Sequence, residues 1–234
     1  MSSIYNKFTQ AAFSGKKLLS VLIDPDKFEE RSAEIFLLNL PENLTHIFVG
    51  GSTVELNKTE TTVQAIKAKI NLPVILFPGD HSQITESADA ILFLSLISGR
   101  NPEFLIEQQV KSVSQLRNSK LEIIPTGYIL IEGGNKSAVQ RVSNTKPIPQ
   151  TEVETIVNTA LAGQFSGKKL IYLEAGSGAE VSISEEIISA VRAAINIPLI
   201  VGGGIRTTQQ LRRTYEAGAD IVVIGTAFEN GEFL

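Results

Sequence analysis

Eight short apolar runs, rich in β-branched residues, recur along the chain and limit the folds that it can adopt. Runs of this length without polar alternation are typical of strands that are buried on both faces, as in a parallel sheet. Segments with helical periodicity separate most of these runs. The alternation predicts a parallel (β/α)₈ barrel, the TIM barrel of the α/β class. The eight runs cover residues 18–24, 45–51, 72–79, 88–96, 121–130, 169–176, 197–204 and 219–227.

Two of the links between strands depart from the regular pattern. The link "DHSQITES" (80–87) after the third run is too weak in helical periodicity for a full helix, and the chain ends soon after the eighth run with "FENGEFL". We therefore expect a shortened or modified helix 3 and last helix. No linker or shift in composition divides the 234 residues. Residues 1–234 are thus predicted to form a single (β/α)₈ barrel domain, a length that such barrels often have.

Charge and composition exclude several classes of function. The net charge is −4 and Lys and Arg form no dense cluster, so we expect no nucleic-acid partner. The chain has no cysteine, which excludes disulfides and thiol chemistry and fits a cytoplasmic location. Neither a signal peptide nor a membrane-spanning apolar stretch is predicted, although a transient contact with a membrane surface stays open.

The stretch "KKLIYLEAGSGAEVS" (168–182) places Glu174 at the end of an apolar run, directly before a turn of small residues. The turn could simply require glycine at positive φ, with Glu174 as a solvated carboxylate. Alternatively, the small residues let backbone N–H groups reach an anion, while Glu174 receives a hydroxyl group or a proton. Barrels carry their chemistry at the C-terminal ends of the strands, where Gly203-Gly204 and Gly225-Thr226 also fall. The three loops together predict a phosphate site.

The end of the first run, "LIDPDK", carries a second candidate site, which could bind a cation. Asp26 could cap the next helix and Pro25 could set the turn, but a carboxylate at the end of an apolar strand, Asp24, needs a cation, a donor or water. Mg²⁺ is one such cation, because it takes few protein ligands when a substrate diphosphate supplies the others. Ser52 or Thr53 could add a hydroxyl ligand. His46 and His81 do not form a metal pair by their positions.

Taken together, the motifs "LSVLIDPDK", "VGGS", "LFPGD", "ILFLSLISGRNPEFLI", "IPTGYILIEGG", "TKPIP", "IYLEAGSGA", "IVGGGIRT" and "VVIGTAFE" resemble the geranylgeranylglyceryl phosphate synthase family of prenylglyceryl phosphate synthases. The resemblance runs from about residue 15 to 230. It implies a Mg²⁺-dependent prenyltransferase that joins a prenyl diphosphate, with geranylgeranyl diphosphate expected, to the C3 hydroxyl of sn-glycerol 1-phosphate. The reaction forms the ether bond of an isoprenoid ether lipid precursor.

The resemblance also implies roles for individual residues. Asp24 and Ser52 match the family's Mg²⁺ ligands. Glu174 and Tyr172 are the expected catalytic residues, with Glu174 either as a general base or as an orienting group. The glycerol phosphate would be held by residues of the sixth, seventh and eighth strand ends: Tyr172, Leu173, Glu174, Ala175, Gly176, Ser177, Gly178, Gly203, Gly204, Gly225 and Thr226.

One position departs from the family pattern. Many members carry a lysine two residues before the motif aspartate, where this chain has Leu22. Any contact of that lysine with the diphosphate must be absent or replaced, and Lys27 and Arg100 are candidates. The pattern "SLISGRNP" is closer to the branch of the family that includes bacterial members.

Two further segments have expected roles in the same reaction. The stretch 88–99 with Phe104, Leu105 and Ile106 could form an apolar groove for the prenyl tail. The segment 132–150 is long and rich in Gly, Ser, Asn and Pro, and we expect a mobile lid there. Exposed apolar residues in "NPEFLIEQQV" could contact a second subunit, so we expect a homo-oligomer.

Two alternatives stay open at this point. A phosphate-binding barrel that acts as an isomerase or synthase on a phosphosugar could use Asp24 and Glu174 as an acid/base pair. A non-catalytic barrel that binds a phosphorylated metabolite would keep the glycine loops, but it gives no reason for both carboxylates.

Overall fold

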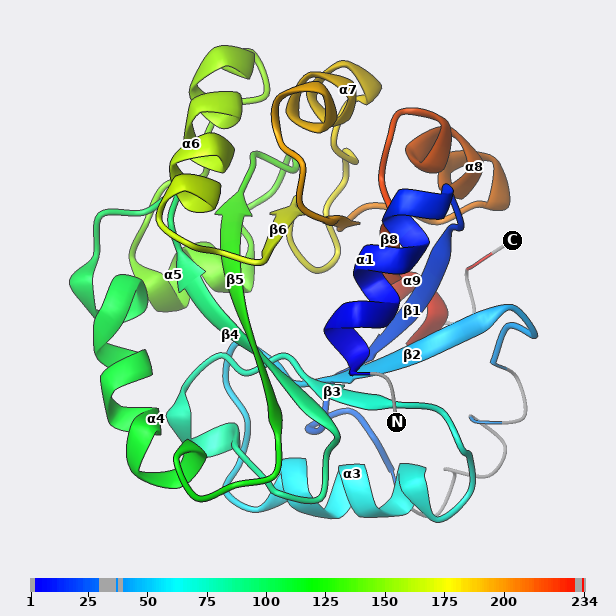
Figure 1. The fold of residues 1–234 in the computed structure, drawn as a ribbon, viewed down its shortest axis with the longest axis vertical. Coiled ribbons are helices and arrows are strands. Elements are labelled where there is room, and N and C mark those ends of the chain that lie inside the picture. Colours follow the sequence, from blue (N-terminus) through cyan, green and yellow to red (C-terminus); the bar gives the residue numbers. More distant parts are fainter. Residues whose placement is uncertain (1–2, 30–36, 38–39, 230–232, 234) are drawn as a thin grey trace.

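A computed structural model of the chain describes residues 3–29, 37, 40–229 and 233. Within these residues, eight parallel strands pair in sequence order and β8 pairs with β1, which closes a barrel (Figure 1). The predicted TIM barrel is confirmed. The strands are β1 Leu18–Ile23, β2 Leu44–Val49, β3 Val74–Leu76, β4 Ala90–Leu96, β5 Glu122–Leu130, β6 Leu170–Glu174, β7 Leu199–Gly202 and β8 Ile221–Ile224.

Helices surround the barrel, in most cases where the periodicity predicts them (Figure 1). The segment 28–40 also has the apolar periodicity of a helix, but most of it lies outside the described residues. The third link holds only a 3₁₀ turn, as predicted, and the last helix covers four described residues. The elements are α1 Ile4–Ser14, α3 Lys58–Lys67, η2 His81–Gln83, the π-helical turn η3 Glu103–Glu107, α4 Gln108–Leu116, α5 Ala138–Ser143, α6 Val153–Phe165, α7 Glu185–Ala194, α8 Thr208–Glu216 and α9 Thr226–Glu229.

The strands bury two separate hydrophobic clusters. Alternate side chains along a strand point to opposite faces of the sheet. On β6, Leu170 and Tyr172 belong to the cluster inside the barrel, while Ile171 and Leu173 belong to the cluster between the sheet and the helices. Both faces are apolar, which explains why the strands appear in the sequence as continuous apolar runs.

Helix α1 closes the barrel at the end where the strands begin. Its residues Ile4, Phe8 and Ala11 are buried in the interior cluster, and the Phe8 ring lies edge-on to His46, 4.9 Å between centroids. Burial, together with the charge of Lys7, lowers the pKa of His46 to about 4. His46 is therefore a neutral packing residue at the base of the barrel, far along β2 from the strand ends that carry chemistry.

The N-terminus of α1 is fixed by one carboxylate at the start of β5. Glu122 accepts hydrogen bonds from the backbone N–H groups of Ile4 at 2.6 Å and of Tyr5 at 2.9 Å. We expect Glu122→Ala to lower the free energy of unfolding by about 1–2 kcal/mol, because two N–H groups at a helix start lose a charged acceptor. Chemical denaturation measures this. Glu86→Ala, which removes an exposed carboxylate that holds no helix end, is the control, and an equal loss in both variants would contradict the capping role.

Candidate active site

A cavity of about 640 Å³ opens at the end of the barrel where the strands finish. Its walls come from the ends of β1, β2, β5, β6, β7 and β8, from Phe77 after β3, and from α5 and the residues before it. Residues from the first and the last strand, Asp24 and Thr226 among them, meet there because all eight strands are parallel. The cavity is lined by these predicted site residues: Asp24, Ser52, Tyr172, Glu174, Gly176, Ser177, Gly178, Gly203, Gly204, Gly225 and Thr226.

Two predicted binding residues do not line the cavity. The side chain of Leu173 is fully buried between the sheet and the helices, because it occupies the outward position between Tyr172 and Glu174. Ala175 is packed in the same outer cluster, and its N–H group donates to the carbonyl oxygen of Gly202. The side chains of these two residues therefore do not reach the cavity, and their expected part in holding glycerol phosphate stays a prediction.

The glycine cup is formed by Gly176–Gly178, Gly203–Gly204 and Gly225–Thr226. The hydroxyls of Ser177 and Thr226 lie 2.8 Å apart and join the first loop of the cup to the third. Gly203 has φ +88°, and a Cβ atom there would lie 2.6–2.8 Å from the Glu174 carboxylate and from the amides of residues 175 and 176. Only glycine permits this approach. The arrangement offers an anion small side chains, backbone amides and hydroxyl groups.

Glu174 lies at the inner edge of this cup and is 6% exposed. Its Oε1 accepts a hydrogen bond of 2.7 Å from the N–H group of Gly176. Burial raises the pKa of Glu174 to about 7, although the hydrogen bond from Gly176 and the Tyr172 hydroxyl each lower it. A carboxylate with such a pKa exchanges protons near neutral pH, as an acid/base group must.

The Tyr172 hydroxyl lies beside this carboxylate but makes no hydrogen bond of good geometry within the described residues. Burial, and next the charge of Glu174, raises the pKa of Tyr172 well above its usual value, so the phenol stays protonated. The hydroxyl is close enough to Glu174 to lower the pKa of that carboxyl, but the contact is not a well-formed hydrogen bond, so a ligand in the cavity would complete the bonding of this buried group. Tyr172 packs on Phe77 and Tyr128, with ring centroids 5.2 and 5.4 Å apart, which fixes its position.

Asp24 and Ser52 lie on the opposite side of the cavity from the cup-forming loop of β6. The Asp24 carboxylate accepts from the N–H group of Asp26 at 3.1 Å, and the Lys27 ammonium lies 3.7 Å away. Thr53 also lines the cavity. Within the described residues, no three acidic or histidine side chains gather to hold a metal. One carboxylate with hydroxyl groups suits a Mg²⁺ ion that takes its other ligands from water and phosphate oxygens, and it does not suit a metal held by protein alone.

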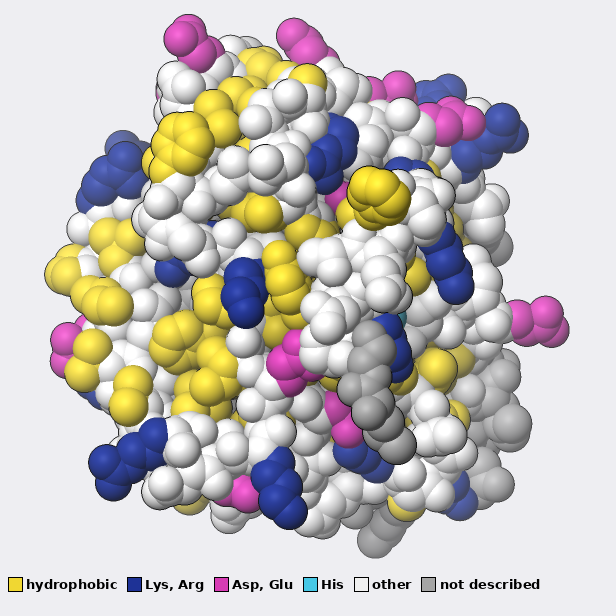
Figure 2. Space-filling model, in the orientation of Figure 1, with side chains coloured by type: hydrophobic (Ala, Val, Ile, Leu, Met, Phe, Trp, Pro, Cys, Tyr) yellow, Lys and Arg dark blue, Asp and Glu magenta, His cyan; other side chains and the backbone are white. Residues whose placement is uncertain are grey.

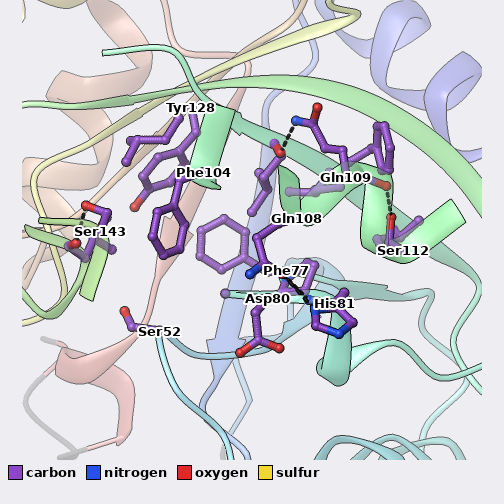
Figure 3. A pocket seen from close by; sticks show the side chains of 18 of the residues that line it. Ser52, Phe77, Asp80, His81, Phe104, Gln108, Gln109, Ser112, Tyr128 and Ser143 are labelled. Carbon is purple, nitrogen blue, oxygen red and sulfur yellow. Dashed lines mark hydrogen bonds between the residues drawn. The ribbon is translucent and has the colours of Figure 1, made fainter. Parts of the chain in front are cut away.

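A second cavity, lined mainly by apolar side chains, adjoins the first. Phe77, Phe104 and Tyr128 project into it, with Ser52 and Asp80 at one side (Figure 3). The two cavities share a wall made of Gly51, Ser52, Phe77, Tyr128 and Val139. Of the predicted groove residues beyond β4, Phe104 lines this cavity, whereas the side chain of Ile106 is about half exposed on the outside of η3.

The segment 132–150 covers the cavity as a well-anchored element and contains α5. Gly133 accepts hydrogen bonds from the N–H groups of Glu180 and Val181, and Asn135 donates to the carbonyl of Gly178 at 2.9 Å. At the other end, Gln150 donates to the carbonyls of Glu132 and Ser182. The segment is thus a folded cover that contains a helix and bonds to the β6 loop, and its expected mobility as a lid stays a prediction.

The structure also resolves the expectations about the missing lysine. Leu22 lines the cavity, so the position itself faces the site. Lys27 lies at the cavity beside Asp24, as proposed. Arg100 does not, because its guanidinium bonds to the carbonyl of Gly99 at 2.7 Å and lies with Asn101 and Lys146 in another hollow. Arg100 is therefore excluded as a replacement.

Four polar lining residues were missed by the sequence reasoning. Asn135, Lys136 and Arg141 come from the segment interpreted as a lid, and Arg206 follows the Gly203-Gly204 pair. Arg206 donates to the carbonyl of Ala179 at 2.6 Å, so its charge lies behind the glycine cup. The sequence signal for Arg206 was present in "GGIRT", since a cation next to a glycine pair suits an anion site.

Comparison with known proteins identifies the family. The model of the PcrB family matches residues 15–233. The chain belongs to the PcrB family. A relative from Zunongwangia profunda named geranylgeranylglyceryl phosphate synthase is 62% identical over the whole of both chains, and one of the same name from Pyrococcus abyssi is 46% identical over 93% of this chain and 86% of its own. The resemblance found in the motifs is confirmed.

A solved structure of a similar protein was determined with a substrate bound. The (S)-3-O-geranylgeranylglyceryl phosphate synthase of Thermoplasma acidophilum, in complex with its substrate sn-glycerol-1-phosphate, is 36% identical. It superposes with a TM-score of 0.89 over 98% of this chain and 92% of its own.

Among the residues that the structure describes here, no helix has the length and apolar character needed to cross a bilayer.

Proposed function

We propose that this PcrB-family protein is a prenyltransferase that joins a prenyl diphosphate, with geranylgeranyl diphosphate as the expected donor, to the C3 hydroxyl of sn-glycerol 1-phosphate. The observation that carries the proposal is the position of Glu174 and Tyr172, buried between the glycine cup and the apolar cavity. Relatives that share 46–62% of their residues with this chain bear the name of that activity, and a structural relative binds that acceptor.

The glycine cup suits the phosphate of the acceptor. Backbone amides of the β6 and β7 loops, the Ser177 and Thr226 hydroxyls and the charge of Arg206 would hold the phosphate oxygens. The glycerol end would then point inward to Glu174 and Tyr172. Holding the hydroxyl next to the donor carbon turns a bimolecular encounter into a positioned reaction, which is a large part of such catalysis.

Glu174 is the group that would orient the C3 hydroxyl and take its proton as the ether bond forms. Its pKa of about 7 leaves a useful fraction of carboxylate at neutral pH. The neutral Tyr172 hydroxyl would donate a hydrogen bond to a glycerol oxygen, which would satisfy its otherwise unbonded group. General-base assistance of this kind typically contributes about 10²- to 10⁴-fold to the rate.

The donor would occupy both cavities. Its diphosphate would lie near Asp24 and Ser52, where Mg²⁺, when bound with it, would supply neutralisation of the leaving-group charge. Its tail would enter the apolar cavity past Phe77 and Tyr128, and each buried CH₂ group contributes about 0.8 kcal/mol to affinity. An enzyme acting on a phosphosugar would have no use for an apolar cavity that shares a wall with the acid/base site.

The direct test is product formation. The purified protein is incubated with sn-glycerol 1-phosphate, Mg²⁺ and radiolabelled prenyl diphosphates of several lengths, and the mixture is extracted for an organic-soluble phosphorylated ether. We expect product with a C20 donor. Product only with a shorter or longer chain would keep the reaction and change the donor, whereas no product with any donor would contradict the proposal.

Asp24 provides a specific test of the metal role. We expect Asp24→Asn to lower kcat/KM for the prenyl diphosphate by about 10- to 100-fold, because one charged ligand is lost while Ser52 and the diphosphate remain. The Mg²⁺ concentration for half-maximal rate should rise, and EDTA should abolish the wild-type rate. Asp26→Asn is the matched control, since Asp26 accepts from the N–H group of Glu55 and does not line the cavity. Equal effects at both positions would contradict a metal role for Asp24.

Two further expectations concern the surroundings of the protein. Hydrophobic side chains gather over α4 on one face of the molecule (Figure 2), and Ile106, Val110 and Val113 are at least half exposed there. This spacing of four and three residues forms one stripe along the helix and supports the predicted contact in a homo-oligomer. A cytoplasmic location and a transient contact with a membrane surface remain predictions.

A further inference from the structure

The cations that line the candidate active site differ in whether they already have partners within the protein. Lys27 pairs with Asp24, and Arg206 is bonded to the β6 loop behind the glycine cup. Within the part of the chain that the structure describes, neither Lys136 nor Arg141 forms an ion pair. A site that must hold a phosphate and a diphosphate together needs more positive charge than the cup supplies.

Both cations belong to α5 or its first flanking residues, and α5 lies over the boundary between the two cavities. Ala138 and Arg141 line the polar cavity, Val142 and Ser143 line the apolar one, and Val139 lines both. Residues three and four apart share one side of a helix, so the two groups form adjoining faces. A molecule with an anionic head in the first cavity and an apolar tail in the second must place its junction beneath α5.

Contacts at both ends hold α5 in this position. Ser137 packs closely on Gly176: a Cβ atom added to Gly176 would lie 2.6 Å from the Cβ atom of Ser137. At the other end, Asn101 donates to the carbonyl of Ser143 at 2.8 Å. The Arg141 guanidinium turns back and donates to the backbone carbonyl of Lys136 at 3.1 Å, and both residues line the polar cavity.

We propose that Arg141 and Lys136 bind the diphosphate of the prenyl donor. The inference rests on the proposed function and names the residues that recognise its second substrate. When the bond between C1 of the prenyl group and the diphosphate oxygen breaks, its electron pair stays on that oxygen. The glycerol oxygen bonds to C1, and its proton goes to Glu174. The guanidinium of Arg141 would stabilise the added negative charge of the released diphosphate, because it can donate hydrogen bonds to two oxygens at once.

This assignment also accounts for the uncharged residue in β1. Leu22 lines the same cavity and contributes no cation, and Lys27 is paired with Asp24, so further positive charge for the diphosphate has to come from another wall. The wall formed by α5 also borders the apolar cavity, through Val139, Val142 and Ser143, and the junction between head and tail has to lie at such a border.

The test separates the two substrates. We measure KM for the prenyl diphosphate, KM for glycerol phosphate and kcat in wild type, Arg141→Gln, Lys136→Gln and Arg141→Lys. Inorganic pyrophosphate serves as a probe without a tail, both as an inhibitor and as a ligand in calorimetry. Because one charge-assisted contact is lost, we expect each glutamine variant to raise the donor KM and the pyrophosphate dissociation constant by about 10- to 100-fold, with Arg141→Lys less affected.

Lys146→Gln and Arg117→Gln are matched controls. Lys146 lies in the same segment but lines a different hollow, and Arg117 ends α4 on the surface. Both should keep wild-type constants. All substituted side chains are exposed, so the variants should melt at the wild-type temperature.

Two results would overturn the inference. If the KM for glycerol phosphate rises as much as the KM for the donor, the two cations help to bind the acceptor phosphate and are not specific for the diphosphate. Unchanged constants in the glutamine variants would give them no role in binding. If wild type forms no ether product with any donor, the proposed function fails, and pyrophosphate calorimetry then decides the anion site by itself.

Discussion

Replacing Glu174 with glutamine is expected to lower kcat by about 10²- to 10⁴-fold and to leave the fold and the glycerol phosphate affinity close to wild type. The glutamine carbonyl can still accept the hydrogen bond from the Gly176 N–H group, so the β6 loop keeps its shape. The amide cannot take a proton from the C3 hydroxyl at any pH. The loss should therefore appear in kcat, which steady-state kinetics on the prenyl transfer measures.

The pH profile distinguishes a base from an orienting group. The buried carboxylate has a pKa of about 7, so the wild-type kcat/KM should rise with pH through about 7 and then level off. In Glu174→Gln, the residual rate should lose this dependence. Glu154→Gln, on the exposed start of α6, is the matched control and should keep the wild-type profile. A glutamine variant that keeps most of the wild-type rate would leave Glu174 with an orienting role only.

The same substitution should stabilise the protein at alkaline pH. The folded state binds the Glu174 proton up to about pH 7, whereas a glutamate in the unfolded chain releases it near its ordinary pKa of 4.5. Between these values the folded state binds more protons, so stability falls as pH rises, and the cost is complete above pH 7. We expect Glu174→Gln to unfold with a higher free energy than wild type at pH 8, by on the order of 2–3 kcal/mol, and without this advantage at pH 4. Denaturation at the two pH values measures the difference.

This trade between stability and activity follows from burial. The sequence places a carboxylate at the end of an apolar strand, and the barrel then encloses it with Tyr172 and the glycine cup. An ionised group in such surroundings costs stability, and that cost is also what brings its pKa into the range of a useful base.

The positions of most site residues could be predicted because they follow from the topology of the barrel. Once eight parallel strands are inferred, their C-terminal ends must share one face, and Asp24, Ser52 and Thr226 become neighbours although far apart in sequence. The predicted set also contains Leu173, whose side chain does not reach the cavity, for an equally simple reason. A motif is a continuous string, but a strand presents only every second side chain to the barrel interior, and Leu173 has the wrong parity.

The contribution of α5 could not be predicted in the same way. This helix has six residues, too few to be stable alone, and it is held by Ser137 against Gly176 and by Asn101 at its end. These contacts are made between distant segments, and local propensity says nothing about them. For the same reason, sequence alone could not separate Arg141, which lines the cavity, from Arg100, which bonds to the backbone outside it.

Replacing Gly203 with alanine is expected to be as damaging as the loss of the carboxylate. The new Cβ atom would lie 2.6 Å from Glu174 Oε1 and 2.8 Å from the amide nitrogens of Ala175 and Gly176. Both the base and the cup must then shift, and displacement of reacting groups by about 1 Å can cost about 100-fold in rate. We expect kcat/KM for glycerol phosphate to fall by at least about 100-fold, with KM raised as well as kcat lowered.

The backbone strain of alanine at positive φ must be separated from this clash. Gly167 has φ +85°, nearly the same as the +88° of Gly203, but a Cβ atom there would meet nothing within 4 Å. Gly167→Ala therefore carries the conformational cost alone, about 1–2 kcal/mol of stability. Denaturation of both variants and kinetics with both substrates give the comparison. If Gly203→Ala loses no more activity than Gly167→Ala, the approach of β7 to the Glu174 loop has no part in binding phosphate; a loss confined to Gly203→Ala means that the cup must hold the phosphate and the base in one fixed geometry.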